Sequence, residues 1–223
     1  MGVIDPVPVD LDAAELLRNL KTGILKLGEE LVTLLEKSRL LIEPKAVYAP
    51  VRVIGIENDQ VCLENGHALR SLVLGDMLER GQEIVAYVVT IGPKLENRAS
   101  QESSLLQSFL LDKIGNYALQ KACAYVKSRT EERFGHTVSE FSPGSGTGEL
   151  FGIDQQEALF RILDPTKSIA VGLTPSYMMV PRKSESGVFA ATREEYVACE
   201  YCPRQCESRR APFKGDYHHF KRT

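Results

Sequence analysis

Three cysteines near the C-terminus are the side chains best suited to chemistry in this chain. Cys199, Cys202 and Cys206 follow a C-x₂-C-x₃-C spacing. Thiolates are soft metal ligands, so three of them this close together predict a metal or iron–sulfur site more readily than disulfides. Pro203 keeps the segment out of a regular helix, which would let the sulfurs converge from a loop. Neighbouring arginines would offset the negative charge of a cluster.

A metal site of this kind usually has four ligands, and only three thiols are evident. The fourth ligand is open between His218, His219, Cys62, Cys123, a residue of a partner and an exogenous ligand. The alternative is a set of free thiols on a C-terminal tail. Cys62 and Cys123 lie in apolar patterns and are predicted to be small buried side chains. An odd number of unevenly spaced cysteines does not fit a disulfide framework.

A glycine-rich turn is the second candidate site, formed by Ser142, Pro143, Gly144, Ser145 and Gly146. Glycine has no Cβ, so the backbone of such a turn can approach a ligand closely, and Gly144 can adopt a positive φ. The turn therefore predicts a binding loop. Because glycine-rich turns are common, an ordinary connection between a strand and a helix is the alternative.

Composition narrows the possible functions. The chain has 223 residues and a formal net charge of −3, so nothing electrostatic favours nucleic acid or an anionic membrane as a partner. No apolar run is long enough to span a bilayer, and the N-terminus lacks the features of a signal peptide, which predicts a cytoplasmic protein. No P-loop, dinucleotide fingerprint or Ser-His-Asp order is present.

Hydrophobic periodicity predicts the elements that position these residues. Helices are expected at 11–20, capped by Asp10, and at 24–41; a helical pattern at 94–133 should break near 100–104, leaving a core helix at 105–134 that ends at Gly135. Gly115 inside that helix predicts close packing against another element. A further helix begins with a capping box at 154–157 and ends at 163. Strands are expected at 46–56, 61–63, 69–74, 83–91, 138–143, 168–173 and 188–191. Runs of strands and runs of helices predict an α+β fold with a mainly antiparallel sheet.

Several segments together resemble the activation domain of cobalamin-dependent methionine synthase. They are Val9–Asp12 with Leu16–Arg18, Glu43–Tyr48 after a leucine-rich helix, Leu111–Gly115, the Ser142–Gly146 turn and Leu173–Gly187. Their order and spacing carry the resemblance, which covers most of residues 9–198. It implies a curved α+β domain with long helices at 1–198, its N-terminal helices at 10–42 packed on it. A cysteine-rich basic segment follows at 199–223.

The resemblance also implies a function. Domains of this family bind S-adenosylmethionine in a shallow groove and dock over the corrinoid after the cobalt has become inactive. A methyl group from S-adenosylmethionine and an electron from a flavodoxin- or ferredoxin-type donor then restore the cofactor. The chain is therefore expected to be an activation component, rather than a self-sufficient enzyme, that works on a corrinoid-binding methyltransferase subunit.

The resemblance assigns the ligand site to the turn at 142–146 and to Tyr196, and it marks two departures. Glu140 stands where the family has an arginine that binds the ligand carboxylate, and Ser145 replaces a tyrosine. An acidic contact from the long helix would come from Glu131 or Glu132. Losing a charge-assisted clamp costs about 1.5–3 kcal/mol. The alternative function is a corrinoid-protein redox or assembly partner that has lost the ligand and works through a metal-binding cysteine cluster. A purely structural interaction subunit is a third reading.

Overall fold

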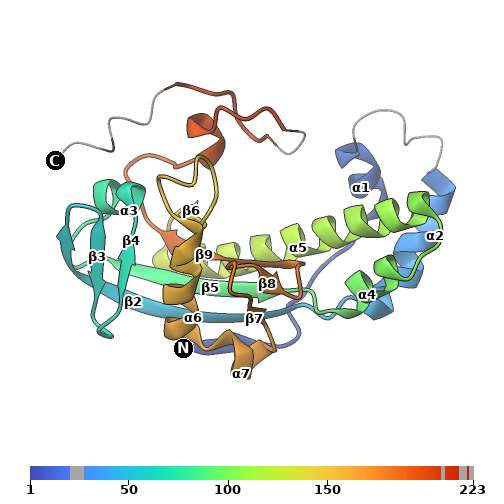
Figure 1. Ribbon diagram of the computed structural model, residues 1–223, viewed down its shortest axis with the longest axis horizontal. Coiled ribbons are helices and arrows are strands. Elements are labelled where there is room, and N and C mark those ends of the chain that lie inside the picture. The colour runs from blue at the N-terminus through green and yellow to red at the C-terminus, as the bar shows by residue number, and fades with distance from the viewer. Residues whose placement is uncertain (21–27, 207–208, 216–219, 221–223) are drawn as a thin grey trace.

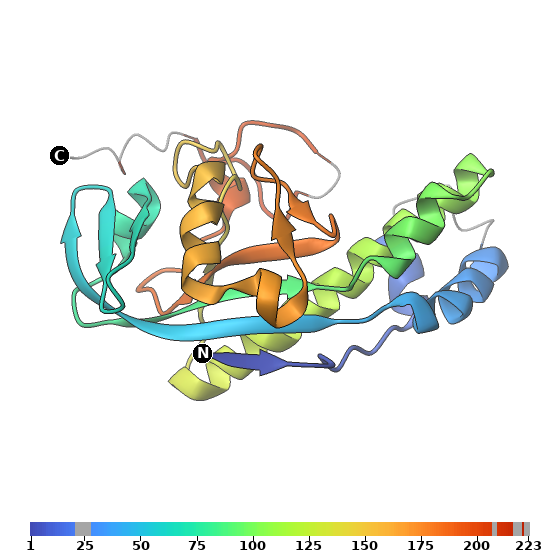
Figure 2. The ribbon, with the colours of Figure 1, turned by 60° about the horizontal axis from the view of Figure 1, so that its bottom comes forward.

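The computed structural model describes residues 1–20, 28–206, 209–215 and 220. Its central feature is a curved antiparallel sheet with strand order β4-β3-β2-β5-β9-β6, to which β1 adds beside β2 (Figures 1 and 2). The strands are β1 (Gly2–Ile4), β2 (Lys45–Glu57), β3 (Gln60–Leu63), β4 (Ala68–Arg70), β5 (Glu83–Thr90), β6 (Ser139–Phe141) and β9 (Ser184–Ala190). β7 (Gly172–Leu173) and β8 (Met179–Val180) form a separate hairpin. The predicted α+β class and antiparallel sheet are confirmed.

The curvature of the sheet starts in β2. The first part of this long strand pairs with β5, from Lys45 to Arg52, and its last part pairs with β3, from Val53 to Glu57. The register shifts between Val53 and Gly55, where the pairing with β3 begins. A bulge of this kind bends a strand and increases its twist, so β2 can belong to two parts of a curled sheet.

The longest helix, α5 (Leu105–Phe134), lies across one face of the sheet. It begins at Ser104, whose hydroxyl accepts the amide of Gln107, and ends at Gly135, where φ is 74°. Both ends match the prediction. The first half of α5 extends beyond the sheet, where α1, α2 and α4 pack on it (Figure 1). The remaining helices are α1 (Ala13–Asn19), α2 (Gly28–Ser38), α3 (Leu72–Met77), α4 (Lys94–Ser100), α6 (Gln156–Leu163) and α7 (Pro165–Ile169).

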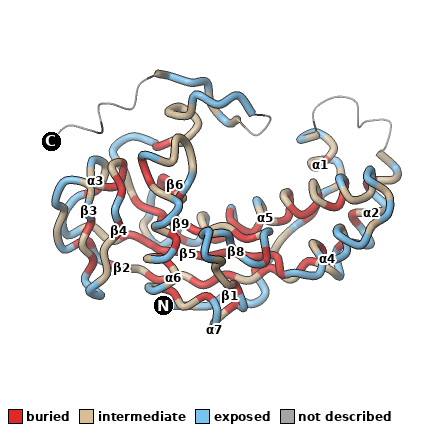
Figure 3. The backbone as a smooth tube through the Cα atoms, in the orientation of Figure 1, coloured by how far each residue is buried: buried red, intermediate tan, exposed pale blue. Residues whose placement is uncertain are grey.

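Three clusters of buried side chains hold these elements together. One joins the second half of α5 to the sheet and includes Tyr87 and Phe189, whose rings stack at 4.2 Å. A second consists of helix side chains from α1, α2, α4 and the first half of α5. The largest covers the opposite face of the sheet with α6 and α7. Figure 3 shows the buried positions following β2, β5 and the inner side of α5, whereas most of the described residues at 203–215 are exposed.

Two predicted strands are partly wrong. In the predicted strand at 69–74, β4 ends at Arg70, and Ser71 caps α3 by accepting the amide of Leu74 at 3.2 Å. In the predicted strand at 168–173, α7 occupies the first positions because Pro165 starts a helix, and only Gly172–Leu173 is extended. Short apolar runs fit a helix or a strand equally well, so a capping serine or an N-terminal proline decides between them.

Two predicted caps are also wrong. Asp12, rather than Asp10, caps α1, with Oδ1 accepting the amide of Glu15 at 2.6 Å. The expected capping box at 154–157 does not form, because a 3₁₀ turn (Ile153–Gln155) precedes α6 and no side chain caps that helix. The second predicted helix is α2 followed by a 3₁₀ turn (Arg39–Leu41); its first expected residues, 24–27, lie outside the described residues.

Candidate ligand-binding site

The glycine turn begins directly after β6 and has the backbone conformation that the sequence predicts. Gly144 and Gly146 both adopt positive φ, at 79° and 73°. The amide of Gly144 donates to the carbonyl of Phe151 at 2.8 Å, and the amide of Ser145 donates to the carbonyl of Ser142 at 3.1 Å. These bonds hold the turn in one shape. Gly144 is exposed, whereas Pro143 is buried, so the turn presents backbone rather than large side chains to its outer side.

Next to this turn, half of β9 has an unpaired edge. Residues 184–190 of β9 pair with β5 on one side, but on the other side β6 reaches only Val188–Ala190. Among the residues that the structure describes, no strand pairs with the outer edge of Ser184–Gly187. Backbone N–H and C=O groups along such an edge can bind an extended ligand. We call this region, with the turn at 142–146 and the side chains of Glu140 and Glu185, the β9 edge site.

Two carboxyl groups meet at the β9 edge site. Glu140 on β6 and Glu185 on β9 lie on the face of the sheet that α5 covers, and the charge of Glu140 acts on the Glu185 carboxyl. The hydroxyl of Tyr87 donates to Glu140 Oε1 at 2.5 Å, and the thiol of Cys123 donates to Glu185 Oε2 at 3.4 Å. Burial, followed by the charge of Glu140, raises the pKa of Glu185 to about 7. Near neutral pH the Glu185 carboxyl is therefore protonated in a substantial fraction of the molecules.

The two neighbours of this pair, Tyr87 and Cys123, stay protonated and therefore uncharged at neutral pH. Burial, with Glu140 next in importance, raises the pKa of Tyr87 well above its ordinary value. Burial and then Glu185 raise the pKa of the Cys123 thiol in the same way. A buried thiol with a raised pKa is a poor nucleophile, so the predicted structural role of Cys123 fits its surroundings. The site thus combines two half-buried carboxyl groups with a buried phenol and a buried thiol, an excess of acidic groups.

A second polar group lies where β9 begins, and sequence reasoning did not identify it. The Lys183 ammonium donates to Asp112 Oδ1 and to Asn116 Oδ1, both at 2.6 Å. Gly115 lies between these two helix positions, and a Cβ there would be 3.3 Å from Lys183 Cε and from Leu95 Cδ2. The predicted close packing at Gly115 is confirmed. The signal in the sequence was Asp112 and Asn116 four residues apart on one helix face, with a glycine between them.

The two glutamates proposed as the acidic contact from the long helix are engaged elsewhere. Glu131 Oε1 accepts the amide of Val138 at 3.2 Å, and Glu132 pairs with Arg129 at 2.5 Å. Both belong to the last turns of α5. The acidic side chain that meets Glu140 is Glu185, which comes from a strand rather than from a helix.

Tyr196 is a core residue in this structure. Its side chain is 7% exposed, and its ring stacks on Phe141 at 4.8 Å and on Tyr201 at 5.7 Å. Its amide donates to Ser139 Oγ at 2.9 Å, and burial raises the pKa of its phenol well above the ordinary value. These contacts anchor the chain that leads into the cysteine segment. Any direct contact with a ligand would need this ring to leave its stack.

The cysteine segment folds around one arginine. The Arg209 guanidinium donates to the carbonyls of Cys199 at 2.8 Å, Cys202 at 2.6 Å, Arg204 at 2.5 Å and Ala211 at 3.0 Å. The segment begins with a short 3₁₀ helix (Ala198–Tyr201) that lies against the glycine turn, where a Cβ on Gly146 would be 3.3 Å from the Ala198 carbonyl. The segment is therefore attached to the β9 edge site through backbone contacts.

The described residues do not assemble the predicted metal site. Cys199 and Cys202 are half-buried and Cys206 is exposed, and none of the five thiols is in a disulfide. Within residues 1–20, 28–206, 209–215 and 220, no three His, Cys, Asp or Glu side chains are arranged to hold a metal ion. Two candidate fourth ligands, Cys62 on β3 and Cys123 on α5, lie on other elements. The other two, His218 and His219, lie outside the described residues. As they stand, the three thiols do not fit a bound metal or cluster.

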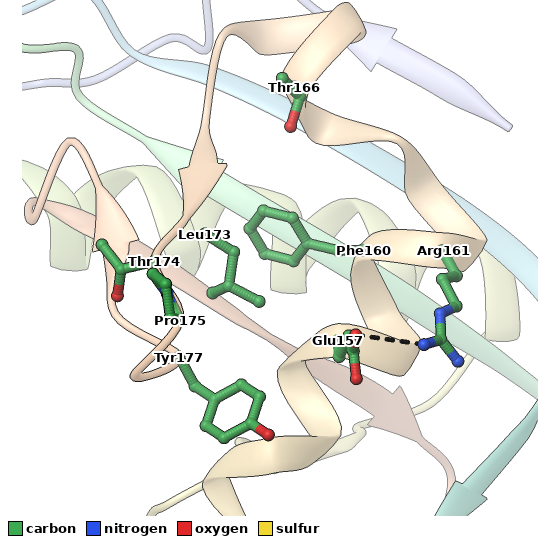
Figure 4. Close-up of a pocket in the computed structure, with 8 residues that line it drawn as sticks. All are labelled: Glu157, Phe160, Arg161, Thr166, Leu173, Thr174, Pro175 and Tyr177. Atoms are coloured by element: carbon green, nitrogen blue, oxygen red, sulfur yellow. Dashed lines mark ion pairs between the residues drawn. The ribbon is translucent and has the colours of Figure 1, made fainter.

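A separate cavity of about 530 Å³ lies between α6, α7 and the β7–β8 hairpin (Figure 4). Phe160 and Leu173 face each other across it, and Glu157 and Arg161 form an ion pair at 3.1 Å on its wall. It is lined by Glu157, Phe160, Arg161, Thr166, Leu173, Thr174, Pro175 and Tyr177. None of these residues belongs to the β9 edge site or to the cysteine segment.

The fold is that of a known domain. No protein-family model and no curated protein matches this chain. Among solved structures, the chain is similar to the MetH reactivation domain bound to AdoHcy, with a TM-score of 0.60 and 15% sequence identity. The match covers 88% of this chain and 81% of that one. The resemblance drawn from the sequence is therefore confirmed for the fold. No helix in the described part of the chain has the length and apolar character needed to cross a membrane.

Proposed function

We propose that this chain binds S-adenosylmethionine at the β9 edge site and takes part in the reductive reactivation of a cobalamin-dependent methyltransferase of the methionine synthase type. The observation that carries the proposal is the fold, shared over 88% of the chain with a domain whose structure contains AdoHcy. Fold alone does not define function, so the chemistry of the site has to support it as well.

The residues of the β9 edge site fit such a ligand. The unpaired edge of Ser184–Gly187 and the turn at 142–146 contain backbone donors and acceptors of the kind that bind adenine and ribose. The Glu140–Glu185 pair supplies negative charge in a buried setting, where its attraction for a sulfonium or ammonium group is stronger than in water. Deprotonation of the pair would be favoured by that cation.

In this proposal the chain binds and orients, and the chemistry belongs to the bound groups. S-adenosylmethionine supplies the methyl group, and cobalamin on the corrinoid-binding subunit receives it with an electron from a flavodoxin- or ferredoxin-type donor. The turn at 142–146 and the β9 edge hold the ligand, Glu185 with Glu140 neutralises its positive end, and the remaining surface docks on the partner. The protein is an activation component rather than a complete methyltransferase.

Calorimetric titration with S-adenosylmethionine tests the proposal. The wild-type chain is expected to bind in the micromolar range, with Glu64→Arg, a change on the exposed β3–β4 connection, as a control that binds equally well. A Glu140→Arg variant restores the arginine of the family. If only that variant binds, the site has kept its shape and lost its ligand, and the proposal is wrong for this chain. Absence of binding in every variant would also overturn it.

If wild type does not bind S-adenosylmethionine, the alternative function, a redox or assembly partner of a corrinoid protein, is favoured. A redox or assembly partner that works through Cys199, Cys202 and Cys206 should contain iron and sulfide, or zinc, when it is purified without oxygen. Metal and sulfide analysis of that preparation, together with the titration, separates the two functions. Protein that binds S-adenosylmethionine and lacks metal supports the first function alone.

A further inference from the structure

Two neighbouring arginines in the cysteine segment, Arg209 and Arg210, differ in what their side chains contact. The Arg209 guanidinium is occupied by the four carbonyls around which the segment folds. The side chain of Arg210 is exposed, and its guanidinium has no hydrogen bond or ion pair with any residue that the structure describes. Burial raises the pKa of Glu185 and of Cys123, and the charge of Arg210 offsets a small part of that rise, which places Arg210 near the β9 edge site. Arg210 is thus a cation with no described side-chain partner, and it lies near the half-buried carboxyl groups of Glu140 and Glu185.

The backbone fixes the place of Arg210. Its amide donates to Cys199 Sγ at 3.4 Å. On the far side of the segment, the amide of Lys214 donates to the carbonyl of Glu200 at 2.9 Å, and the two side chains form an ion pair at 2.7 Å. Figure 1 shows the segment, in orange-red, passing above β6 and the loop that follows it. These contacts return the chain to its 3₁₀ helix, so the position of Arg210 relative to the glycine turn is set by the fold of the segment.

The amino-acid end of S-adenosylmethionine needs such an arrangement. Its ammonium and carboxylate groups are attached to the same carbon, so a complementary site must offer an anion and a cation side by side. The Glu140–Glu185 pair offers only the anion. A carboxylate placed there without a cation would meet two acidic side chains, one of them with a raised pKa.

We propose that Arg210 binds the carboxylate of S-adenosylmethionine and performs the role that an arginine at position 140 has in the family. The inference rests on the proposed function. A guanidinium binds a carboxylate through two parallel hydrogen bonds, a geometry that an ammonium cannot reproduce. The residues around Arg209 and Arg210 then complete the ligand site. The hydrogen bonds of Arg209 to four carbonyls fix the backbone that positions Arg210 for the ligand.

Other cations near the site are already engaged. The Lys183 ammonium has two oxygen partners at 2.6 Å, and its side chain is only 15% exposed. Arg182 pairs with Glu96 at 2.7 Å through its Nε. Breaking either arrangement to bind a ligand would cost an existing charge-assisted bond, whereas Arg210 loses only water.

The test compares two ligands and three variants. S-adenosylmethionine and decarboxylated S-adenosylmethionine differ only in the carboxylate, and each is titrated into wild type, Arg210→Gln, Arg210→Lys and Arg204→Gln. Arg204 is an exposed arginine of the same segment, so its change is the matched control for lost charge. Arg210→Gln is expected to weaken S-adenosylmethionine by about 10- to 100-fold and to leave the decarboxylated ligand within about twofold. Arg210→Lys should lie between wild type and Arg210→Gln.

Each other outcome overturns the inference in a recognisable way. If Arg210→Gln binds S-adenosylmethionine as wild type does, Arg210 has no role, and the proposed function stands without it. If Arg210→Gln weakens both ligands equally, Arg210 only supports the fold of the segment. Equal weakening by Arg204→Gln would indicate a general effect of charge. If wild type binds neither ligand, the proposed function fails and the inference fails with it.

Discussion

The two polar clusters beneath β9 differ in how their charges are balanced. Where the strand begins, the Lys183 ammonium is held between Asp112 and Asn116 of α5, at 2.6 Å from each. Two residues further along the chain, Glu185 lies near Glu140 and accepts from the thiol of Cys123, which is farther along the same helix. The first cluster contains its own counter-charge. The second contains two carboxyl groups and, among the residues that the structure describes, no cation apart from the nearby Arg210.

This difference separates a structural cluster from a binding site. A partly exposed ion pair with a second hydrogen bond, like that of Lys183, already satisfies its charge and leaves no group for a ligand to bind. The pKa of Glu185 is raised by burial and by the charge of Glu140, so a cation beside these two carboxyl groups would be stabilised. We call the Lys183, Asp112 and Asn116 group the balanced cluster and the Glu140, Glu185 and Cys123 group the unbalanced cluster. The unbalanced cluster lies beside the glycine turn and the unpaired edge of β9, so its carboxyl groups could contact a ligand bound there.

The largest effect is expected from crowding the unbalanced cluster at Gly187. A Cβ there would be 2.5 Å from the carbonyl of Phe141 and 3.0 Å from the Tyr87 ring. Gly187→Val should therefore separate β6 from β9 and lower the free energy of unfolding by more than about 3 kcal/mol. Urea denaturation measures the change. Gly172→Ala is the control, because its nearest neighbour would be 4.0 Å away; a similar loss in both variants would contradict the special packing of Gly187.

The sheet and the long helix could be predicted from the sequence because their signals are local. β5 is an uninterrupted apolar run, and α5 has a serine cap at Ser104 and a glycine at its end. The short elements could not be predicted as well. In 69–74 and 165–173 the apolar pattern spans only a few residues, so Ser71 and Pro165 decided the outcome through single hydrogen bonds and one fixed φ angle.

The next largest effect is a dependence of stability on pH. The pKa of Glu185 is raised to about 7 in the folded protein and returns to its ordinary value, 4.5, on unfolding. The folded state therefore binds the proton more strongly, so stability is fully present below the unfolded pKa and is lost as pH rises towards 7. The loss should reach up to about 3 kcal/mol. Glu185→Gln should flatten the profile between these pH values, as measured by urea denaturation at each pH; an unchanged slope would mean that another group titrates.

The same proton should affect ligand binding in the opposite sense. If the deprotonated pair attracts the positive end of S-adenosylmethionine, affinity should rise as pH increases through about 7. A rise of several-fold between pH 6 and pH 8 is expected for wild type, on the order of 1 kcal/mol in binding free energy. Calorimetry at the two pH values measures it. Glu185→Gln should bind more weakly and show no rise, and a pH-dependent affinity in that variant would assign the effect elsewhere.

The site was harder to predict than the fold because its residues meet only in three dimensions. The turn at 142–146 and Glu140 were visible as a motif with a departure from the family. The acidic contact of the ligand site was expected on the long helix, whereas the acidic side chain near Glu140 is Glu185, 45 positions later in the sequence, on the strand β9 that pairs with β6. That pairing depends on sheet order, which periodicity does not reveal.

Tyr87→Phe should lower the stability by less than deprotonation of Glu185 does. The ring is fully buried and stacked on Phe189, so the variant keeps the packing and removes only the hydroxyl that donates to Glu140 at 2.5 Å. Leaving a partly buried carboxyl without its donor should cost about 1–2 kcal/mol of unfolding free energy. Tyr125→Phe, outside this network, should cost less than about 0.5 kcal/mol. Equal costs would mean that the hydroxyl does not support Glu140.

The smallest effect should come from the balanced cluster, which makes the comparison sharper. Asp112→Ala removes the charged partner of Lys183, but the Asp112 side chain is 48% exposed and Asn116 still accepts from the ammonium. A half-exposed ion pair contributes little, because water screens it and can replace the lost oxygen, so the loss should be below about 1 kcal/mol. Urea denaturation of Asp112→Ala beside Asp112→Asn measures it. A loss above about 2 kcal/mol would show that Lys183 depends on its counter-charge as strongly as Glu140 depends on Tyr87, and the contrast between the two clusters would disappear.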